Sequence, residues 1–137
     1  MPVLGDLSAS TVIAVAATPN KLPKEENERL DALFRSDPLL EQLGAELVEW
    51  GPGVAVVRAA IQRAHTNFLG GGHGGIIFSL GDVAMSFASN GYGRQAVATQ
   101  IDISYHRAVQ AGDLVVLRGS FGKVQTPQGR GADRCTA

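Results

Sequence analysis

Two stretches of the chain repeat apolar residues at helical spacing. In the first, which starts at Pro23, the apolar residues Leu30, Leu33 and Phe34 recur at helical spacing beside Glu25, Glu26, Glu28 and Arg29. This spacing predicts an amphipathic helix that ends near Asp37-Pro38, because proline cannot continue a helix. A short further turn is expected over residues 39–43.

The second helical stretch, residues 75–90, combines a broad apolar face with a narrow polar stripe. The apolar face would contain Ile76, Ile77, Leu80, Val83, Ala84 and Phe87. The polar stripe would contain Ser79, Asp82, Ser86 and Ser89, three or four positions apart. A carboxylate on a mostly buried helix costs free energy unless hydrogen bonds or a function compensate for it. Asp82 is therefore the first candidate functional residue.

Four further stretches have the pattern of β-strands. Residues 47–50 and 54–61 flank Gly51-Pro52-Gly53 and predict an antiparallel hairpin. Residues 97–105 alternate apolar and polar side chains and carry the clearest strand signal in the chain. Residues 114–121 predict another strand. Together these elements predict an α+β domain, in which a largely antiparallel sheet packs on one main helix.

The two ends of the chain differ from this pattern. We expect residues 1–22 to form a flexible N-terminal extension and residues 23–121 to form the domain. Residues 122–137 contain glycine, proline and charged residues, with Val124 as their only large aliphatic residue. We expect an atypical tail there, without a further strand.

Composition narrows the class of protein. The chain has 137 residues, the size of one domain, with 45% hydrophobic and 18% charged residues. Its net charge of −1 gives no reason to expect nucleic acid or an anionic membrane as a partner. The single cysteine excludes an internal disulfide and favours a reducing compartment. Residues 11–18 are too short an apolar stretch to span a bilayer, and no basic start precedes them, so a cytoplasmic protein is expected.

The glycines before the second helix suggest a role for its first turn. Gly74 and Gly75 fall where the helix would begin, and the first N–H groups of a helix have no intrahelical partner. Without side chains in the way, these groups could reach a carbonyl oxygen or a developing oxyanion. Gly74 and Asp82 would lie roughly 12 Å apart along the axis, at 1.5 Å per residue. One small reacting group cannot touch both, so the chemistry requires two antiparallel copies of the helix, and hence a dimer.

Plainer interpretations of these residues remain open. Glycine-rich turns often precede helices, and one buried aspartate is often a structural hydrogen-bonding residue. The run Gly70–Gly75 is not a phosphate loop, because no Gly-Lys-Ser/Thr follows it. His65 and His73 could bind zinc, but cysteine ligands and a helical histidine pair are missing, so no metal site is expected.

The stretch HTNFLGGGHGGIIFSLGDVAMSFASN, followed by VATQIDISYHRAVQAGD, resembles the hotdog-fold acyl-CoA thioesterases of the phenylacetic-acid-degradation (PaaI-like) branch. The similarity covers about residues 40–121. The family motif has an Asn six residues before the His of His-Gly-Gly, an acid nine residues after that His, and a Ser or Thr four residues later. Asn67, His73, Asp82 and Ser86 match these positions.

The resemblance implies one long helix wrapped by an antiparallel sheet, in homodimers or homotetramers. It implies hydrolysis of an acyl-CoA substrate without a metal or other cofactor. Asp82 would act as general base or nucleophile, and the Gly74 N–H would hold the thioester oxygen. Asn67 would place the carbonyl or the water, Ser86 would orient the water, and His73 would support the oxyanion loop.

The resemblance also implies two residues that contact the substrate. Gly75 belongs to the His-Gly-Gly motif, and Arg107 would meet a CoA phosphate.

Two features of the chain depart from the family. Where the family usually has Tyr-x-Arg-Pro, this chain has Ala108 in place of the proline. Family members also continue past residue 121 with a long internal strand, which residues 122–137 do not resemble, so that strand is expected to be missing or altered.

Three functions follow from the resemblance. The first is hydrolysis of aryl- or medium-chain acyl-CoA thioesters. The second is acyl-CoA binding without catalysis. The intact Asp82 and Asn67 argue against it, and the atypical tail argues for it. The third is a hotdog dehydratase, which uses a differently placed acid and histidine pair. The fold alone does not decide among them.

Overall fold

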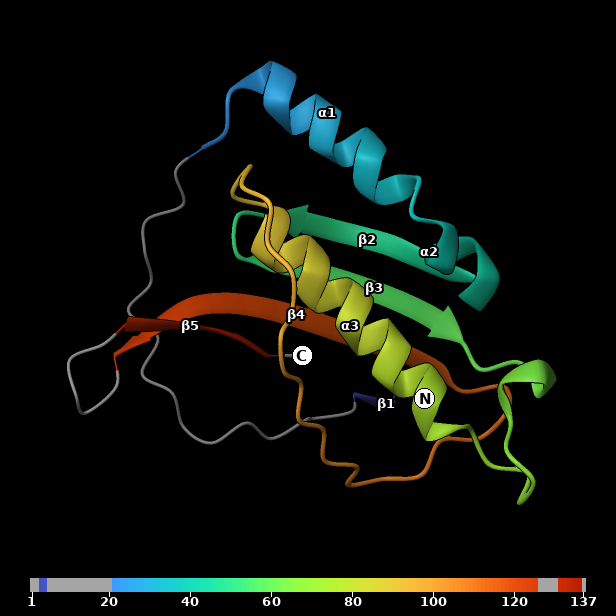
Figure 1. Cartoon of the computed structure of the whole chain (residues 1–137). Coiled ribbons are helices and arrows are strands. Elements are labelled where there is room, and N and C mark those ends of the chain that lie inside the picture. The colour runs from blue at the N-terminus through green and yellow to red at the C-terminus, as the bar shows by residue number, and fades with distance from the viewer. Residues whose placement is uncertain (1–2, 5–20, 126–130, 137) are drawn as a thin grey trace.

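The structure is a computed structural model that describes residues 3–4, 21–125 and 131–136 (Figure 1). Within these residues, three α-helices and a short 3₁₀ helix accompany five strands. In chain order the elements are β1 (Val3–Leu4), α1 (Lys24–Arg35), α2 (Pro38–Leu43), β2 (Ala45–Gly51), β3 (Val54–Ala60), η1 (Arg63–His65), α3 (Gly74–Asn90), β4 (Leu114–Gln125) and β5 (Gly131–Thr136).

The strands form one sheet with β4 near its centre. Its order is β1-β4-β3-β2, and β5 also pairs with β4. β2 and β3 form the predicted antiparallel hairpin, and β3 pairs antiparallel with β4 from Val54 opposite Ser120 to Ala60 opposite Leu114. The hairpin and the strand predicted over residues 114–121 are therefore confirmed.

α3 lies across one face of this sheet, as Figure 1 shows. Its buried residues are Leu80, Gly81, Val83, Ala84, Phe87 and Ala88, while Ile76 and Ile77 pack against the core at its N-terminal end. The predicted apolar face is thus the face that meets the sheet. Gly119 of β4 lets the helix come close, because a Cβ there would collide with the Ala84 carbonyl group.

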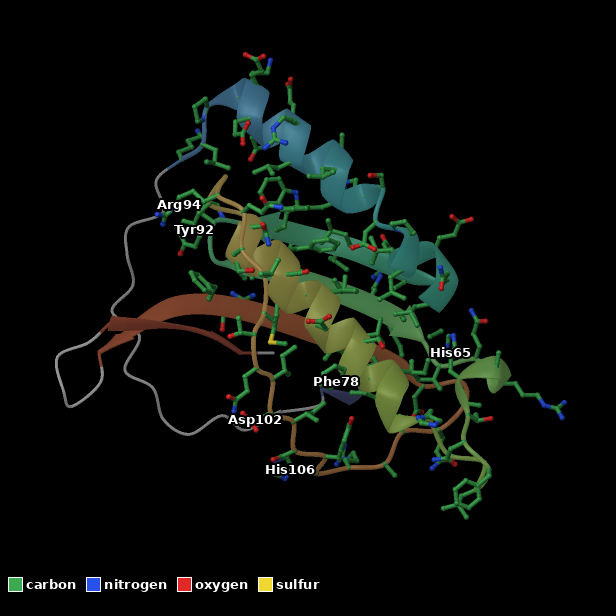
Figure 2. All side chains as sticks on the ribbon, viewed as in Figure 1. His65, Phe78, Tyr92, Arg94, Asp102 and His106 are labelled. Atoms are coloured by element: carbon green, nitrogen blue, oxygen red, sulfur yellow. The ribbon has the colours of Figure 1, made fainter. Side chains whose placement is uncertain are left out.

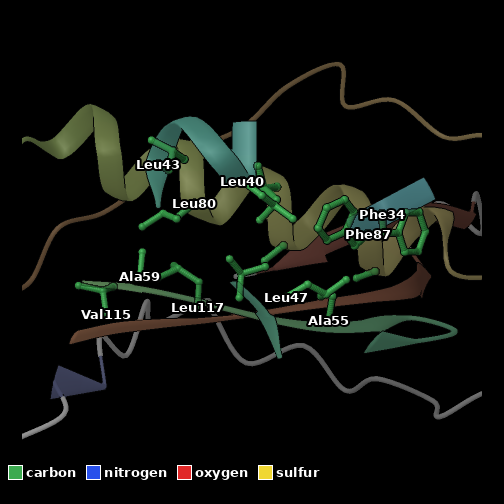
Figure 3. Close-up of a cluster of buried hydrophobic side chains, with 14 of the residues drawn as sticks. Phe34, Leu40, Leu43, Leu47, Ala55, Ala59, Leu80, Phe87, Val115 and Leu117 are labelled. Atoms are coloured by element: carbon green, nitrogen blue, oxygen red, sulfur yellow. The ribbon is translucent and has the colours of Figure 1, made fainter. Parts of the chain in front are cut away.

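Aromatic rings join α1 to the rest of the core (Figure 3). The Phe34 ring stacks on Phe87 of α3 at 4.8 Å and meets Trp50 of β2 edge-on at 4.9 Å. Such ring pairs add stabilisation beyond the apolar area that they bury. The predicted first helix is therefore a packed part of the domain.

Polar contacts of Asp31 reinforce this attachment. The Trp50 indole N–H donates to Asp31 Oδ1 at 2.9 Å, and Arg35 Nε lies 3.0 Å from Asp31 Oδ2. Arg35 also donates to the Leu47 carbonyl oxygen at 3.0 Å. The hydrogen bond from Trp50, and then that from Arg35, hold the pKa of Asp31 below its ordinary value.

The strand predicted over Val97 to Tyr105 does not form. These residues are irregular, and no backbone–backbone hydrogen bond is recorded for residues 97–108 within the described part of the chain. A strand needs a neighbour for its backbone N–H and C=O groups. The outer edge of β4 instead pairs with β1 at Val115 and Val116 and with β5 over residues 120–125. The alternating residues therefore have no strand partner, and Val97 is 82% exposed.

The expectation that residues 122–137 contain no strand is also wrong. β4 continues to Gln125, and β5 pairs antiparallel with it from Ser120 opposite Thr136 to Gln125 opposite Gly131. The pairing uses backbone groups, which Gly131–Thr136 can supply because the segment contains no proline. It therefore does not require the alternating apolar pattern on which the prediction relied.

The N-terminal extension expected over residues 1–22 lies mostly outside the described residues. Within it, Val3 and Leu4 form β1, which pairs parallel with Val115 and Val116 of β4. In the described parts of the chain, no helix is long and apolar enough to cross a membrane.

Candidate active site

The first turn of α3 offers one free backbone donor. His73 is the N-cap of the helix, and its Nδ1 accepts the Gly75 N–H at 3.1 Å. The Ile76 N–H donates to the His73 carbonyl oxygen at 3.0 Å. Among the described residues, no acceptor takes the Gly74 N–H. The N–H groups of Gly74 and Gly75 were both expected to be able to reach a carbonyl oxygen of a substrate. Among the described residues, only the Gly74 N–H is available for this.

Asn67 builds the turn before this helix. Its backbone N–H donates to the Gly71 carbonyl oxygen at 2.8 Å, and its carbonyl oxygen accepts the Gly70 N–H at 2.9 Å. Its side-chain Oδ1 accepts the Leu69 N–H at 2.9 Å. Within the described residues, the Asn67 Nδ2 makes no hydrogen bond, so this donor is available to a ligand.

Backbone bonds attach this loop to the domain at two places. The His73 N–H donates to the His65 carbonyl oxygen at 2.8 Å, and the Gly72 N–H donates to the Val109 carbonyl oxygen at 2.7 Å. His65 is 6% exposed, and its Nδ1 accepts the Gln62 N–H at 3.1 Å. Figure 2 shows His65, the last residue of η1, close to the N-terminal end of α3. The start of α3 is thus fixed to η1 and to the segment that precedes β4.

The two histidines share a hollow but form no metal cluster. The hollow has a volume of about 290 Å³ and is lined by Ala64, His65, Thr66, His73, Gly75 and Ile76. In the part of the chain that the structure describes, no group of three or more His, Cys, Asp and Glu side chains could hold a metal ion. The Nδ1 atoms of both histidines already accept backbone N–H groups.

Asp82 lies farther along the same helix. It is the only charged residue of α3 and is half-buried. No hydrogen bond or ion pair of its carboxylate is recorded within the described residues. Ser86, one turn later, is half-buried as well. This carboxylate is therefore available to a ligand, a water molecule or another chain.

The structure brings together only some of the predicted site residues. His73, Gly74 and Gly75 form the first turn of α3, and Asn67 lies in the loop attached to it. Asp82 is eight residues from Gly74, roughly 12 Å along the helix. Within one chain, the predicted carboxylate and the predicted oxyanion donor therefore do not meet.

Two further residues of interest, Tyr105 and Arg107, follow α3 in the sequence. Arg107 is exposed, in the irregular segment that precedes β4. Tyr105, which the sequence placed in a strand and in the Tyr-x-Arg motif without a role of its own, donates its hydroxyl to the Gly74 carbonyl oxygen at 2.8 Å. The sequence held one signal for a role of Tyr105 at the site: it lies two residues before Arg107, in the Tyr-x-Arg part of the motif.

Comparisons with known proteins agree with this architecture. Residues 69–126 match the thioesterase superfamily. The acyl-coenzyme A thioesterase PaaI of Escherichia coli is 34% identical over 84 residues, which are 61% of this chain and 60% of that protein. The chain spans between 51% and 60% of the length of the curated relatives that it matches.

Solved structures extend the comparison to the fold. The structure of the E. coli PaaI protein aligns with a TM-score of 0.66 and 25% identity, over 80% of this chain and 88% of that one. A mutant of the phenylacetic acid degradation protein PaaI from Thermus thermophilus aligns with a TM-score of 0.61 and 31% identity, over 73% of this chain and 95% of that one.

These matches show that the chain belongs to the thioesterase superfamily, as a PaaI-like protein with the hotdog fold. The α+β hotdog fold and the family predicted from the sequence are confirmed. The roles of the individual site residues remain predictions.

Proposed function

We propose that this protein hydrolyses acyl-CoA thioesters to a free acid and CoA. The observation that carries the proposal is that α3 presents two groups without a partner among the described residues, the Gly74 N–H and the Asp82 carboxylate. The family supports a thioester as the substrate, and the E. coli relative is named as an acyl-coenzyme A thioesterase.

The chemistry requires a donor and a base on opposite sides of the thioester carbonyl group. The Gly74 N–H, at the positive end of the α3 dipole, would stabilise negative charge that develops on the carbonyl oxygen. Asp82 would accept a proton from water as the new C–O bond forms, or would attack the carbonyl carbon itself. The C–S bond then breaks, and the CoA thiolate leaves and takes up a proton. In the second route the acyl group is left on Asp82 as a mixed anhydride, which water then cleaves to release the free acid and restore the carboxylate.

The remaining residues would hold the substrate and the water. Asn67 would use its free Nδ2 to place the carbonyl oxygen or the water, and Ser86 would orient the water toward the thioester. His73 supports the donor by holding the Gly75 N–H, and Gly75 leaves the adjoining hollow open for the substrate. The exposed Arg107 would bind a CoA phosphate.

The separation of the two groups along α3 supports a site built from two chains. A second copy of the helix, running antiparallel, would bring its Asp82 toward Gly74 of the first. We therefore propose a homodimer, or a tetramer made of such dimers, as the active unit. Aryl- and medium-chain acyl groups are the proposed substrates, to be compared in a panel of acyl-CoA thioesters.

Replacement of Asp82 by Asn tests the catalytic role. Asp82→Asn keeps the shape of the side chain and removes its charge, so kcat should fall by at least about a hundredfold, the usual effect of losing a general base. Asp102→Asn is the matched control, because Asp102 is exposed and bonds only to Gln100 among the described residues. It should keep the wild-type kcat.

Near-native turnover by Asp82→Asn would overturn the assignment. The alternative function, acyl-CoA binding without catalysis, predicts saturable binding of the thioesters with no release of CoA by the wild-type chain. Unchanged circular dichroism and thermal midpoints of both variants would show that the fold is intact.

A further inference from the structure

The peptide group between Gly74 and Gly75 is held at both ends. At one end, its carbonyl oxygen accepts the Tyr105 hydroxyl at 2.8 Å. At the other end, its N–H donates to His73 Nδ1 at 3.1 Å. Tyr105 and His73 come from segments on opposite sides of α3 in the sequence, so both segments orient this peptide.

The ring of Tyr105 also occupies the place where a side chain at position 74 would stand. A Cβ built on Gly74 would lie 3.2 Å from both Tyr105 Cζ and Tyr105 Oη. These distances are shorter than ordinary carbon contacts, which lie near 3.5–4.0 Å. Tyr105 therefore fits against Gly74 closely enough to limit the movement of that residue.

Fixing Gly74 has a chemical consequence. Two successive glycines give the start of a helix unusual backbone freedom, because glycine populates more φ/ψ space than any other residue. A backbone donor stabilises an oxyanion best when it already points at the position where the charge develops. The contacts with Tyr105 restrict the torsions of Gly74 and therefore the direction of its free N–H.

We propose that Tyr105 is a positioning residue that holds the Gly74 N–H in the direction needed for thioester hydrolysis. This inference rests on the proposed function. Tyr105 acts through Gly74: its hydroxyl binds the Gly74 carbonyl oxygen, and its ring packs on the Gly74 Cα. The residue thus gives the irregular segment before β4 a role in organising the site.

Tyr105→Phe removes the hydroxyl and keeps the ring. We expect kcat to fall about three- to tenfold, the effect of losing one neutral hydrogen bond, with KM nearly unchanged. Tyr92→Phe is the matched control, since Tyr92 is the other tyrosine of the chain and lies near the opposite end of α3 (Figure 2). It should leave kcat unchanged.

A double-mutant cycle tests the packing of the ring on Gly74. Gly74→Ala keeps the backbone N–H but forces the new methyl group against Tyr105, so kcat should fall. Removal of the ring in Gly74→Ala/Tyr105→Ala should add less loss than Tyr105→Ala causes alone, because the two residues act through one contact. Additive losses would contradict the proposed coupling.

A measurement without substrate separates this inference from the proposed function. In nitrogen-15 NMR spectra, Tyr105→Phe should shift the Gly74 amide resonance, whereas Tyr92→Phe should leave it in place. If the wild-type chain turned over no acyl-CoA, the proposed function would fail and this measurement would still decide the coupling. An unchanged Gly74 resonance, or an unchanged kcat in an active enzyme, would overturn the role of Tyr105.

Discussion

Two aspartates of this chain have contrasting surroundings. Asp31 accepts the Trp50 indole N–H and pairs with Arg35, so its carboxylate is engaged in holding α1 to β2. Asp82 has no recorded partner among the described residues, although it is half-buried on the central helix. A carboxylate without structural bonds is available to contact a substrate or a water molecule. The contrast supports a structural role for Asp31 and a chemical role for Asp82.

The lowered pKa of Asp31 predicts how stability depends on pH. A carboxyl group whose pKa is lower in the folded chain contributes stability above its unfolded pKa, near 3.8, and loses it as the pH falls through the folded value. Asp31→Asn should therefore lower the thermal midpoint at neutral pH. The difference from wild type should shrink once the pH drops below about 4.

Thermal unfolding of both chains between pH 2.5 and pH 7, roughly spanning the titration of an aspartate, measures this effect. The Asn side chain keeps an oxygen for Trp50, so the variant mainly reports the loss of charge. Asp102→Asn serves again as the control and should show no comparable gap at neutral pH. If the difference in thermal midpoint between wild type and Asp31→Asn stayed constant at all pH values, the ionised form of Asp31 would not stabilise the fold.

The contact between α3 and β4 depends on one small residue. Gly119 lies under the Ala84 carbonyl group, where the backbone of the helix leaves no room for a Cβ. The helix cannot move away freely, because Leu80, Val83 and Phe87 are packed in the core (Figure 3). Close approach of the two elements is therefore required by the packing of the whole helix face.

Gly119→Ala should destabilise the domain by about 1–3 kcal/mol, the usual cost of overpacking a core. In chemical denaturation, this loss should appear as a lower denaturant concentration at the unfolding midpoint. The slope of the unfolding free energy against denaturant concentration should stay the same. Gly51→Ala is the matched control, because a Cβ there meets only Val54 Cγ1 at 3.7 Å, an ordinary contact. Equal midpoints for Gly119→Ala and wild type would show that α3 and β4 separate without cost.

The single chain does not form a complete site by the mechanism proposed above. The proposed hydrolysis needs both Gly74 and Asp82, yet these residues lie roughly two turns apart on one rigid helix. A dimer related by a two-fold axis repeats every contact, so it would contain two identical sites, each with Gly74 from one chain and Asp82 from the other.

Mixing two inactive variants tests this arrangement. In a dimer of one Asp82→Asn chain and one Gly74→Val chain, one site has both wild-type groups and the other has neither. Random exchange should restore about a quarter of the wild-type turnover, since half of the dimers are mixed and each has one intact site. Neither variant alone should recover on incubation. A wild-type monomer that is fully active in sedimentation experiments would exclude a shared site.

Features set by neighbouring residues were predictable from the sequence alone. The spacing of apolar residues predicted α1, α2, α3 and the hairpin of β2 and β3, because the period of a helix or strand is a local property. The apolar face of α3 followed from the same spacing. The motif around Asn67, His73 and Asp82 identified the family before any contact was known.

Features that depend on distant partners were decided by the tertiary structure. Residues 97–105 have the period of a strand, yet β1 and β5 occupy the edge of β4, and a strand forms only where its backbone groups are paired. β5 formed without an apolar pattern, because backbone pairing does not need one. The engagement of the Gly75 N–H by His73, and of the Gly74 carbonyl oxygen by Tyr105, depends on how two loops converge on one helix end. Such convergence is a property of three-dimensional packing, which no local pattern of residues records.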